Sequence, residues 1–540
     1  MAKTIVVYGA TMAGVAAAAK AAKNANNAVI HLIVPDPVDH NGNGCCLGAI
    51  GTVGGQNFFD IGWKRVNGEK IYFTKGSFKW WSNDGDNQFY SVDDMAALLK
   101  SDLTKAEYQG KIQIHYGYDI TKVNWTSPAR ILSVNLKQIK REESTGDVVW
   151  EDVEKTIYGD VFIDASESGR LTRLSNFGGT VGRYDWPADK LDSDERGSSG
   201  KARQQAASLM FKVSGFNMED LREDLEVGKG HPNGVCSATG GKDAYKDKNR
   251  KIYQFNEKYG PTGFAIKPFN MAQDGPNDTE WWVNALLVFN VDGRAYNRDK
   301  GTSIFPSDMR ADYKTVDDAW VRAREIIDTS DFLEAIREFP GFRDATIVKK
   351  DGKPVVGNVL YLRETIHSAF SSSARANGTE DSNYALSAED FWNPGATKNT
   401  GNDSRHYAKR MGLNYYGLDI NAYKFEDLKR NGQYIWGHEV TEAVRSDIKF
   451  PDHVSPTYIT YSAIATNFMY NLLIPGYAAG IASLGWAEAR TIPNQCVLGD
   501  AAGVAAAYAV NNNIDPLNFG SADITAVQNT LKNSGALLEK

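Results

Sequence analysis

The chain has 540 residues, of which 42% are hydrophobic and 24% are charged, and its formal net charge is −7. This balance is typical of a soluble globular protein long enough for two or three domains. An acidic chain is a poor match for nucleic acid or an anionic membrane, because both select a basic surface. We therefore expect a small-molecule substrate, no nucleic-acid partner and no membrane partner.

Residues 4–34 show the order strand, helix, strand, written "TIVVY", "MAGVAAAAKAAKN" and "AVIHLIV". Gly9 and Gly14 have the spacing of a dinucleotide-binding turn, in which the free N–H groups at a helix start face a pyrophosphate. Thr11 stands where the second glycine of that turn is usual. Either its side chain bends away and offers its hydroxyl as a donor, or the segment is an ordinary α/β crossover.

The second strand of such a unit usually ends in an acidic residue that accepts hydrogen bonds from the adenosine ribose. Here that position is Val34, and the nearest carboxylate is Asp36 in "VPDP". Either Asp36 takes over the ribose hydroxyls or the backbone holds them.

Further along the chain, residues 39–57 form a glycine-rich loop, and residues 91–108 are predicted to be helical from Ser91 as N-cap. Strand-like segments follow at 111–119, 129–142 and 148–157, and we expect an antiparallel meander that returns to a buried strand at 159–166. Residues 190–455 are mixed and rich in tryptophan and tyrosine. The C-terminal block predicts a strand "NLLIPG", a strand passing into a helix over 495–512, and an amphipathic terminal helix from residue 522.

Five features together resemble one family. They are the turn from Gly9 to Gly14, the strand end Asp164-Ala165-Ser166, "LRET" at 362–365, Arg490 with Pro493, and "LGDAAG" at 498–503. The chain resembles the FAD-dependent oxidoreductase family of the glutathione-reductase-like flavoprotein superfamily over residues 4–60, 90–183 and 455–540. Members of that family often carry threonine at the second glycine position, so the resemblance favours FAD as the dinucleotide.

The resemblance implies an α/β fold with a discontinuous Rossmann-like FAD-binding domain, which includes the small antiparallel meander, at residues 1–60, 90–189 and 455–540. An inserted mixed α+β substrate domain would comprise residues 61–89 and 190–454. Asp500 would contact the flavin ribityl chain or pyrophosphate from a strand-to-helix turn. The full set of expected cofactor-binding residues is Gly9, Thr11, Met12, Ala13, Gly14, Asp36, Gly42, Gly44, Cys45, Cys46, Ala165, Ser166, Gly499, Asp500, Ala501 and Gly503.

The adjacent Cys45 and Cys46 lack the spacing of a redox-active disulfide, and we interpret them as small buried thiols beside a noncovalent flavin. A covalent flavin link through Cys45, Cys46 or His40 is the alternative. Neither cysteine nor histidine spacing predicts a metal site.

Arg363 and Glu364 are the first catalytic candidates, since an arginine can hold an anionic substrate or stabilise reduced flavin and a carboxylate can accept a proton. Adjacent opposite charges are equally often a solvated or interdomain pair. His438 is a second candidate base, and Trp80-Trp81 and Trp281-Trp282 are either stacking platforms or core.

Three functions remain open at this point. The first is an FAD-dependent oxidoreductase that moves hydride from a small organic substrate, such as an alcohol or polyol, to flavin N5, with oxygen or another acceptor reoxidising it. The second is a flavin monooxygenase that uses external NAD(P)H, although no second dinucleotide fingerprint is present. The third is a non-catalytic carbohydrate-binding protein on a flavin fold. Because the first strand begins at Thr4, we expect no export signal and a cytoplasmic location, with a removed signal peptide as the alternative.

Overall fold

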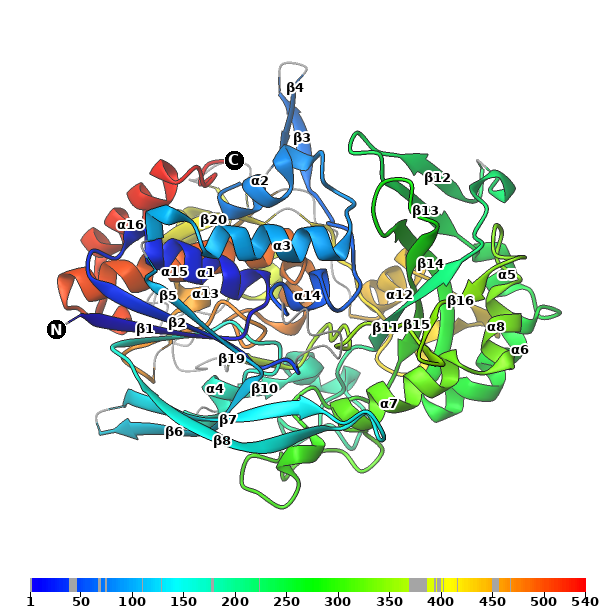
Figure 1. Ribbon diagram of the computed structural model, residues 1–540, viewed down its shortest axis with the longest axis horizontal. Coiled ribbons are helices and arrows are strands. Elements are labelled where there is room, and N and C mark those ends of the chain that lie inside the picture. Colours follow the sequence, from blue (N-terminus) through cyan, green and yellow to red (C-terminus); the bar gives the residue numbers. More distant parts are fainter. Residues whose placement is uncertain are drawn as a thin grey trace.

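The computed structural model describes residues 2–37, 46–66, 69–72, 75–108, 110–127, 129–175, 179–222, 224–368, 386–392, 395, 400–401, 403–414, 416–448, 456–466 and 468–540 (Figure 1). A five-stranded parallel sheet lies at its centre, in the order β24–β9–β1–β2–β5. The strands are β1 (Lys3–Tyr8), β2 (Ala28–Val34), β5 (Ile112–Tyr116), β9 (Val161–Asp164) and β24 (Leu472–Leu473). The strand–helix–strand start predicted from the sequence is confirmed, with α1 over Met12–Asn24.

Both faces of this sheet are covered, which explains why β1 is an almost continuous apolar run. Ile5 and Val7 pack into the core that contains the helices, whereas Val6 and Tyr8 pack into a second core beneath the sheet. Figure 1 shows α1, α3 (Val92–Leu103) and α15 (Ile492–Asn512) on one side of the sheet and an antiparallel meander on the other. The meander consists of β6 (Tyr118–Thr126), β7 (Arg130–Arg141) and β8 (Val148–Tyr158).

The predicted meander is confirmed, but its first strand was placed wrongly. Residues 111–119 were expected as one strand, whereas Gly117 turns the chain with a φ of +66° and divides it. The part before Gly117 is β5 of the parallel sheet, and the part after it is β6 of the meander.

A six-stranded antiparallel sheet occupies the middle of the sequence, in the order β12–β13–β14–β15–β11–β16 (Figure 1). Its strands are β11 (Ala207–Ser214), β12 (Val227–Gly230), β13 (Cys236–Gly240), β14 (Phe264–Gln273), β15 (Glu280–Val288) and β16 (Thr346–Ile347). Trp281 and Trp282 are buried in β15, and Trp81 is buried while Trp80 is exposed. Only Trp80 is therefore open to solvent among the four tryptophans considered as platforms.

The remaining elements among the described residues are short or peripheral. The helices are α2 (Ser77–Trp81), α4 (Arg170–Leu174), α5 (Lys242–Lys246), α6 (Lys251–Tyr259), α7 (Val316–Ile327), α8 (Ser330–Ile336), α10 (Ala388–Trp392), α11 (Asp403–His406), α12 (His438–Ile448), α13 (Tyr461–Ile464), α14 (Ser483–Ala489) and α16 (Ser521–Asn533). The strands are β3 (Trp63–Val66), β4 (Glu69–Tyr72), β10 (Gly179–Val181), β17 (Lys349–Lys350), β18 (Lys353–Pro354), β19 (Ile366–Ser368), β20 (Arg410–Asn414), β21 (Lys429–Arg430), β22 (Gln433–Tyr434) and β23 (Thr457–Thr460). None of the helices in the described part of the chain is long and apolar enough to cross a bilayer.

The strand predicted at the start of 495–512 is wrong, because α15 already begins at Ile492. Thr491 is the N-cap and Pro493 lies in the first turn, a pair that favours a helix start. Most of α15 is buried all round, so its sequence lacks the alternating polar face by which a helix is recognised. Gly499 and Gly503 therefore lie inside this helix and not at a turn.

These two glycines allow α1 and α15 to pack very closely. A Cβ atom on Gly499 would lie 2.2 Å from the carbonyl oxygen of Ala13, and one on Gly503 would lie 2.3 Å from that of Ala17. Only glycine fits such backbone contacts, and the alanines of α1 offer the matching flat surface.

Gly503→Ala is expected to destabilise the protein, although alanine normally favours a helix by about 1 kcal/mol over glycine. The added methyl group must separate α15 from α1, at a cost of about 1–3 kcal/mol. Urea unfolding followed by circular dichroism tests this, with Gly417→Ala as the control because nothing lies within 4 Å of a Cβ there. A Gly503→Ala midpoint at or above that of the unmodified protein would contradict the packing argument.

Candidate functional site

A tight glycine turn connects the carboxyl end of β1 to α1. Gly9 has a φ of +93°, and a Cβ atom there would lie 2.6 Å from the backbone of Ser166, at the end of β9. A Cβ atom on Gly14 would lie 1.9 Å from the carbonyl oxygen of Gly9. Both positions therefore exclude any larger residue, and the turn brings the start of α1 against the end of β9.

Thr11 is the N-cap of α1, and its hydroxyl is fully engaged. The Oγ1 atom donates to the carbonyl oxygen of Ala165 at 2.8 Å and accepts from the backbone N–H of Gly14 at 3.3 Å. The side chain thus joins β9 to α1. The first N–H groups of α1, which have no intrahelical acceptor, keep the positive end of the helix dipole at this edge of the sheet.

A cleft opens at this edge. Its walls come from the ends of β1, β2 and β9, from the meander and from the segment around Leu360, and they include Gly9, Ala10, Thr11, Asp36, Arg141, Ser166, Glu167, Ser168, Asn358, Leu360 and Leu362. Four of the expected cofactor-binding residues, Gly9, Thr11, Asp36 and Ser166, thus lie together. Glu167 Oε1 is buried in this cleft and has no hydrogen-bond partner among the described residues, so it is available to accept a hydrogen bond from a ligand hydroxyl group.

Asp36 lies beyond the end of β2, as the sequence predicted. Burial raises the pKa of its carboxyl group to about 7, and the nearby charge of Asp119 adds to the rise. The glycine cradle, the helix start and an acidic residue after β2 are the features that a bound dinucleotide requires. The residues of the cleft therefore fit FAD.

The other expected cofactor-binding residues lie in three different places. Met12, Ala13 and Gly14 form the first turn of α1, and Ala165 follows β9 directly. Cys46 is buried, and its Sγ atom donates to the carbonyl oxygen of Pro37 at 3.4 Å. His40, Gly42, Gly44 and Cys45 lie outside the described residues.

Asp500 does not stand at the strand-to-helix turn that the sequence predicted. It lies in the middle of α15, where its carboxylate accepts hydrogen bonds from the backbone N–H of Ser77 at 2.9 Å and from Ser77 Oγ at 2.5 Å. Gly499, Ala501 and Gly503 are buried in the same helix. None of the four lines the cleft, because they belong to the interior of α15 and not to its start.

A second cavity, of about 300 Å³, lies beside the six-stranded sheet. Its lining is mostly polar: Gln56, Asp60, Thr239, Lys267, Asn270, Asn284, Tyr361, Arg363, Tyr416, Asp419, Asn421 and Arg490, with Phe58, Pro268, Phe269 and Trp436. Three buried atoms of this lining, Gln56 Oε1, Asn284 Oδ1 and Arg490 Nε, have no hydrogen-bond partner in the part of the chain that the structure describes.

Arg490 organises one end of this cavity. It follows α14, and its guanidinium donates to Asp419 Oδ2 at 2.7 Å and to the Tyr361 hydroxyl at 2.5 Å. These neighbours raise the pKa of Arg490 despite its burial. Burial and the charge of Asp419 also raise the pKa of Asp60 to about 6, against the opposing effect of Arg490.

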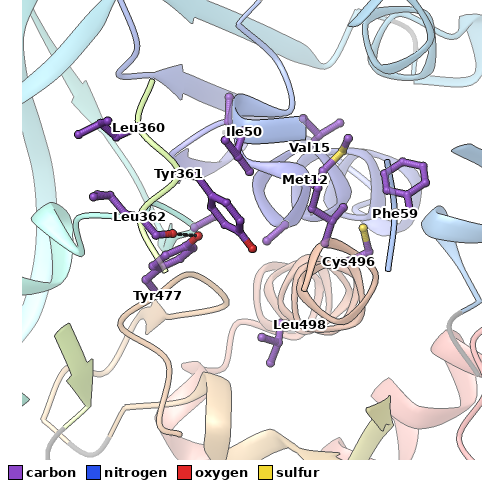
Figure 2. Packing of buried hydrophobic residues seen from close by; sticks show 14 of the residues in the cluster. Met12, Val15, Ile50, Phe59, Leu360, Tyr361, Leu362, Tyr477, Cys496 and Leu498 are labelled. Carbon is purple, nitrogen blue, oxygen red and sulfur yellow. Dashed lines mark hydrogen bonds between the residues drawn. The ribbon is translucent and has the colours of Figure 1, made fainter. Parts of the chain in front are cut away.

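One extended segment separates the cleft from the cavity. Leu360 and Leu362 line the cleft, whereas Tyr361 between them lines the cavity. Figure 2 shows this segment beside Met12 of α1 and Cys496 of α15, with the Tyr477 hydroxyl donating to the carbonyl oxygen of Leu362 at 2.8 Å. The two spaces thus adjoin each other across the three-residue segment Leu360-Tyr361-Leu362.

The three expected catalytic residues are separated. Arg363 lines the cavity, where its Nη1 and Nη2 atoms donate to the carbonyl oxygen of Ala206 and to Ser208 Oγ. Glu364 lines neither space, since its carboxylate is buried against Ser483 Oγ and His367 Nε2. His438 is on the surface at the start of α12, with its side chain 81% exposed and paired to Glu442.

Three lining residues, Asp60, Lys267 and Asp419, were not predicted from the sequence, and Arg490 was predicted only as part of the resemblance. Asp60 comes after the glycine-rich loop, and Lys267 is a charged residue in the apolar strand "FAIKPFNMAQ" of β14. A lysine in a buried strand is a signal that could have been used, because such charges need a partner. Asp419 lies in an irregular segment and gave no signal.

The profile of the FAD dependent oxidoreductase family matches residues 120–531 of the chain. The chain belongs to the FAD-dependent oxidoreductase family. Membership in this family indicates FAD as the cofactor. No match was found among the curated proteins.

Solved structures similar to this chain have low sequence identity to it. The P. aeruginosa PqsL in complex with 2-aminobenzoylacetate is 9% identical, with a TM-score of 0.30 over 98% of this chain and 90% of that chain. The myxobacterial chondrochloren halogenase CndH is 13% identical, with a TM-score of 0.28 over 68% of this chain and 64% of that chain. The glycerol-3-phosphate dehydrogenase from Bacillus halodurans complexed with FAD is 10% identical, with a TM-score of 0.23 over 54% of this chain and 49% of that chain. The alignment spans less than two thirds of the latter two proteins.

Thr11→Val is expected to weaken FAD retention by about tenfold or more. Valine has the same shape but leaves the carbonyl oxygen of Ala165 and the N–H of Gly14 without their partner, a loss of about 1–3 kcal/mol at the site. The flavin-to-protein absorbance ratio after dialysis measures retention. Thr11→Ser, which keeps the hydroxyl, is the control, and equal flavin content in both variants would refute the role of this hydroxyl.

Proposed function

We propose that the protein oxidises a small, hydroxyl-bearing organic substrate, an alcohol or a polyol, in the polar cavity beside the FAD cleft. The observation that carries this proposal is the lining of the cavity. Three buried polar atoms, on Gln56, Asn284 and Arg490, have no partner within the described ranges and call for a ligand that can both donate and accept hydrogen bonds. Hydroxyl groups do both, and Trp436 and Phe58 supply the apolar surface on which a sugar-like carbon chain packs.

FAD, when bound, supplies a two-electron acceptor for a substrate C–H bond. The residues of the cleft that would hold it are Gly9, Thr11, Asp36 and Ser166 together with the start of α1. Cofactor and substrate would approach each other at Leu360-Tyr361-Leu362, the segment that adjoins both spaces.

Asp60 is the proposed proton acceptor. Oxidation of an alcohol to a carbonyl compound removes a hydride from carbon and a proton from the hydroxyl oxygen, so a base must receive that proton. Asp60 lines the cavity, and its pKa of about 6 leaves it ionised near neutral pH. Arg490 and Tyr361 would orient the substrate. Glu364 has no part in this proposal, because its carboxylate is enclosed by His367 and Ser483.

The parallel sheet with its three-stranded meander supports placement in the glutathione-reductase-like superfamily, with residues 1–60, 90–189 and 455–540 as the FAD-binding domain. The six-stranded sheet, which contributes Thr239, Lys267 and Asn284 to the cavity, supports an inserted substrate domain within 61–89 and 190–454. A small molecule as the only type of partner, with no nucleic acid and no membrane, remains part of the proposal.

Anaerobic mixing with a panel of alcohols, polyols and sugars tests the reaction. A substrate of this class should bleach the flavin absorbance at about 450 nm without NAD(P)H. Bleaching by NAD(P)H alone would overturn direct oxidation and favour the monooxygenase function. A protein that binds sugars but is reduced by neither would be the non-catalytic binding protein.

Asp60→Asn should slow flavin reduction by about a hundredfold or more while the FAD content stays unchanged, because only the base is lost. In the unmodified protein the reduction rate should rise with pH through about 6 and then level off, since Asp60 must be ionised to accept a proton. Stopped-flow absorbance at a series of pH values measures both effects.

Asp403→Asn is the matched control, because burial also raises the pKa of Asp403 to about 6 but this residue does not line the cavity. That variant should keep the pH profile. An unchanged profile in Asp60→Asn would show that another group is the base.

A further inference from the structure

Two of the cations in the cavity have no carboxylate partner. Lys267 and Arg363 are each only 2% exposed, and neither is within 4.0 Å of an acidic side chain in the described part of the chain. Lys267 donates to the carbonyl oxygen of Asn284 at 2.8 Å and to Asn270 Oδ1 at 3.0 Å. Arg363 donates to the carbonyl oxygen of Ala206 at 2.6 Å and to Ser208 Oγ at 3.0 Å. Every one of these acceptors is neutral.

Neutral acceptors satisfy hydrogen bonds but do not balance a buried charge. Burying an unpaired ammonium or guanidinium group is costly, and proteins retain such groups mainly where a ligand or a counter-ion pairs with them. Burial and the repulsion from Arg363 hold the pKa of Lys267 far below its usual range, while burial and the charge of Arg490 lower that of Arg363 to about 10. An anion next to both groups would balance their charges and favour their protonated forms.

Among the residues described, the cavity also contains two acidic groups, and the charge of Asp419 partly opposes the lowering of the pKa of Lys267 and of Arg363. Asp419 pairs with Arg490 at 2.7 Å, and Asp60 is influenced by Asp419 and Arg490. The described lining therefore contains three cations, Lys267, Arg363 and Arg490, against two carboxylates. The cavity therefore offers a proton acceptor together with an excess of positive charge.

We propose that the substrate is a hydroxylated carboxylic acid, such as an aldonic or uronic acid, whose carboxylate is bound by Lys267 and Arg363 while its hydroxyl groups face Asp60 and Asp419. This inference rests on the proposed function and narrows its substrate class. A carboxylate accepts charge-assisted hydrogen bonds from both cations, and an arginine fork matches its planar geometry. The side-chain amide of Asn270 contacts Lys267, and Asn284 also lines the cavity, so both amides are suited to the hydroxyl groups of the substrate.

D-Gluconate and D-sorbitol are suitable probes, because they have the same six-carbon chain and differ only in a carboxylate at one end. Isothermal titration of the FAD-loaded protein should show gluconate binding at least about tenfold more tightly than sorbitol, as expected for a charge-assisted contact. The neutral D-gluconamide, which has nearly the shape of gluconate, should bind like sorbitol. Equal affinities for all three compounds would overturn the proposal without any variant being needed.

Lys267→Met should remove most of the preference for gluconate over sorbitol. Lys314→Met is the matched control, since burial likewise lowers the pKa of Lys314 but its Nζ atom donates to the carbonyl oxygen of Thr262 outside the cavity. If Lys267→Met does not fold, Arg363→Lys and the gluconamide comparison carry the test. A preference that survives in a folded Lys267→Met protein would contradict the assignment of the carboxylate position.

Different results would overturn the anionic substrate and the proposed oxidation reaction. Reduction of the flavin by sorbitol, with neither binding nor reduction by gluconate, would leave the oxidoreductase proposal standing and overturn the anionic substrate. Tight binding of gluconate that depends on Lys267, with no flavin reduction by any hydroxy compound, would support the anion site and overturn the proposed reaction. Tighter binding of a sorbitol phosphate than of gluconate would overturn the choice of a carboxylate.

Discussion

The close packing of α1 against α15 is the constraint on which the cofactor cleft depends. Gly499 and Gly503 bring the two helix backbones so close that a methyl group on either would lie 2.2–2.3 Å from a carbonyl oxygen of α1. α1 is thereby fixed between α15 and the sheet, and Thr11 bonds its start to the end of β9. The orphan N–H groups of that first turn consequently face a rigid cleft, as recognition of a pyrophosphate requires. The "LGDAAG" segment does not line the cleft, but its two glycines allow the packing that positions α1.

The cavity differs from the closely packed surroundings of the cleft, because some of its buried polar groups lack hydrogen-bond partners among the described residues. Arg490 is held by Asp419 and Tyr361, yet its Nε atom has no partner among the residues described, and Lys267 and Arg363 are buried there with no carboxylate within 4.0 Å. A folded protein tolerates few such groups, and they concentrate where a ligand completes the hydrogen bonds and the charge balance. In the segment Leu360-Tyr361-Leu362, Tyr361 lines the cavity and the two leucines line the cleft. This segment therefore adjoins both the polar cavity and the cofactor cleft.

Sequence patterns predicted the parts of the fold that depend on local rules. The first strand, α1 and the second strand follow from two short apolar runs and a capped helix start, and Gly9, Thr11, Asp36 and Ser166 do converge on one cleft. The start of α15 was missed, because a helix that is buried on all sides has no periodic polar face. Asp60 and Asp419 were missed because they meet only through tertiary packing, and the roles given to Glu364 and His438 rested on residue type without knowledge of burial. Residues from distant segments meet in one cavity only after the chain has folded, so local sequence patterns do not predict which of them will share it.

We propose that the cleft at the start of α1 binds the adenosine half and the pyrophosphate of FAD. Titrating the flavin-free protein with FAD and with FMN, followed by flavin fluorescence, tests this claim most directly, because FMN lacks the adenosine half that the cleft would hold. The account predicts that FAD binds about a hundredfold or more tightly than FMN, a difference of about 3 kcal/mol. Equal affinities for FAD and FMN would contradict it, since the adenosine half would then make no contact with the residues around Gly9, Asp36 and Ser166.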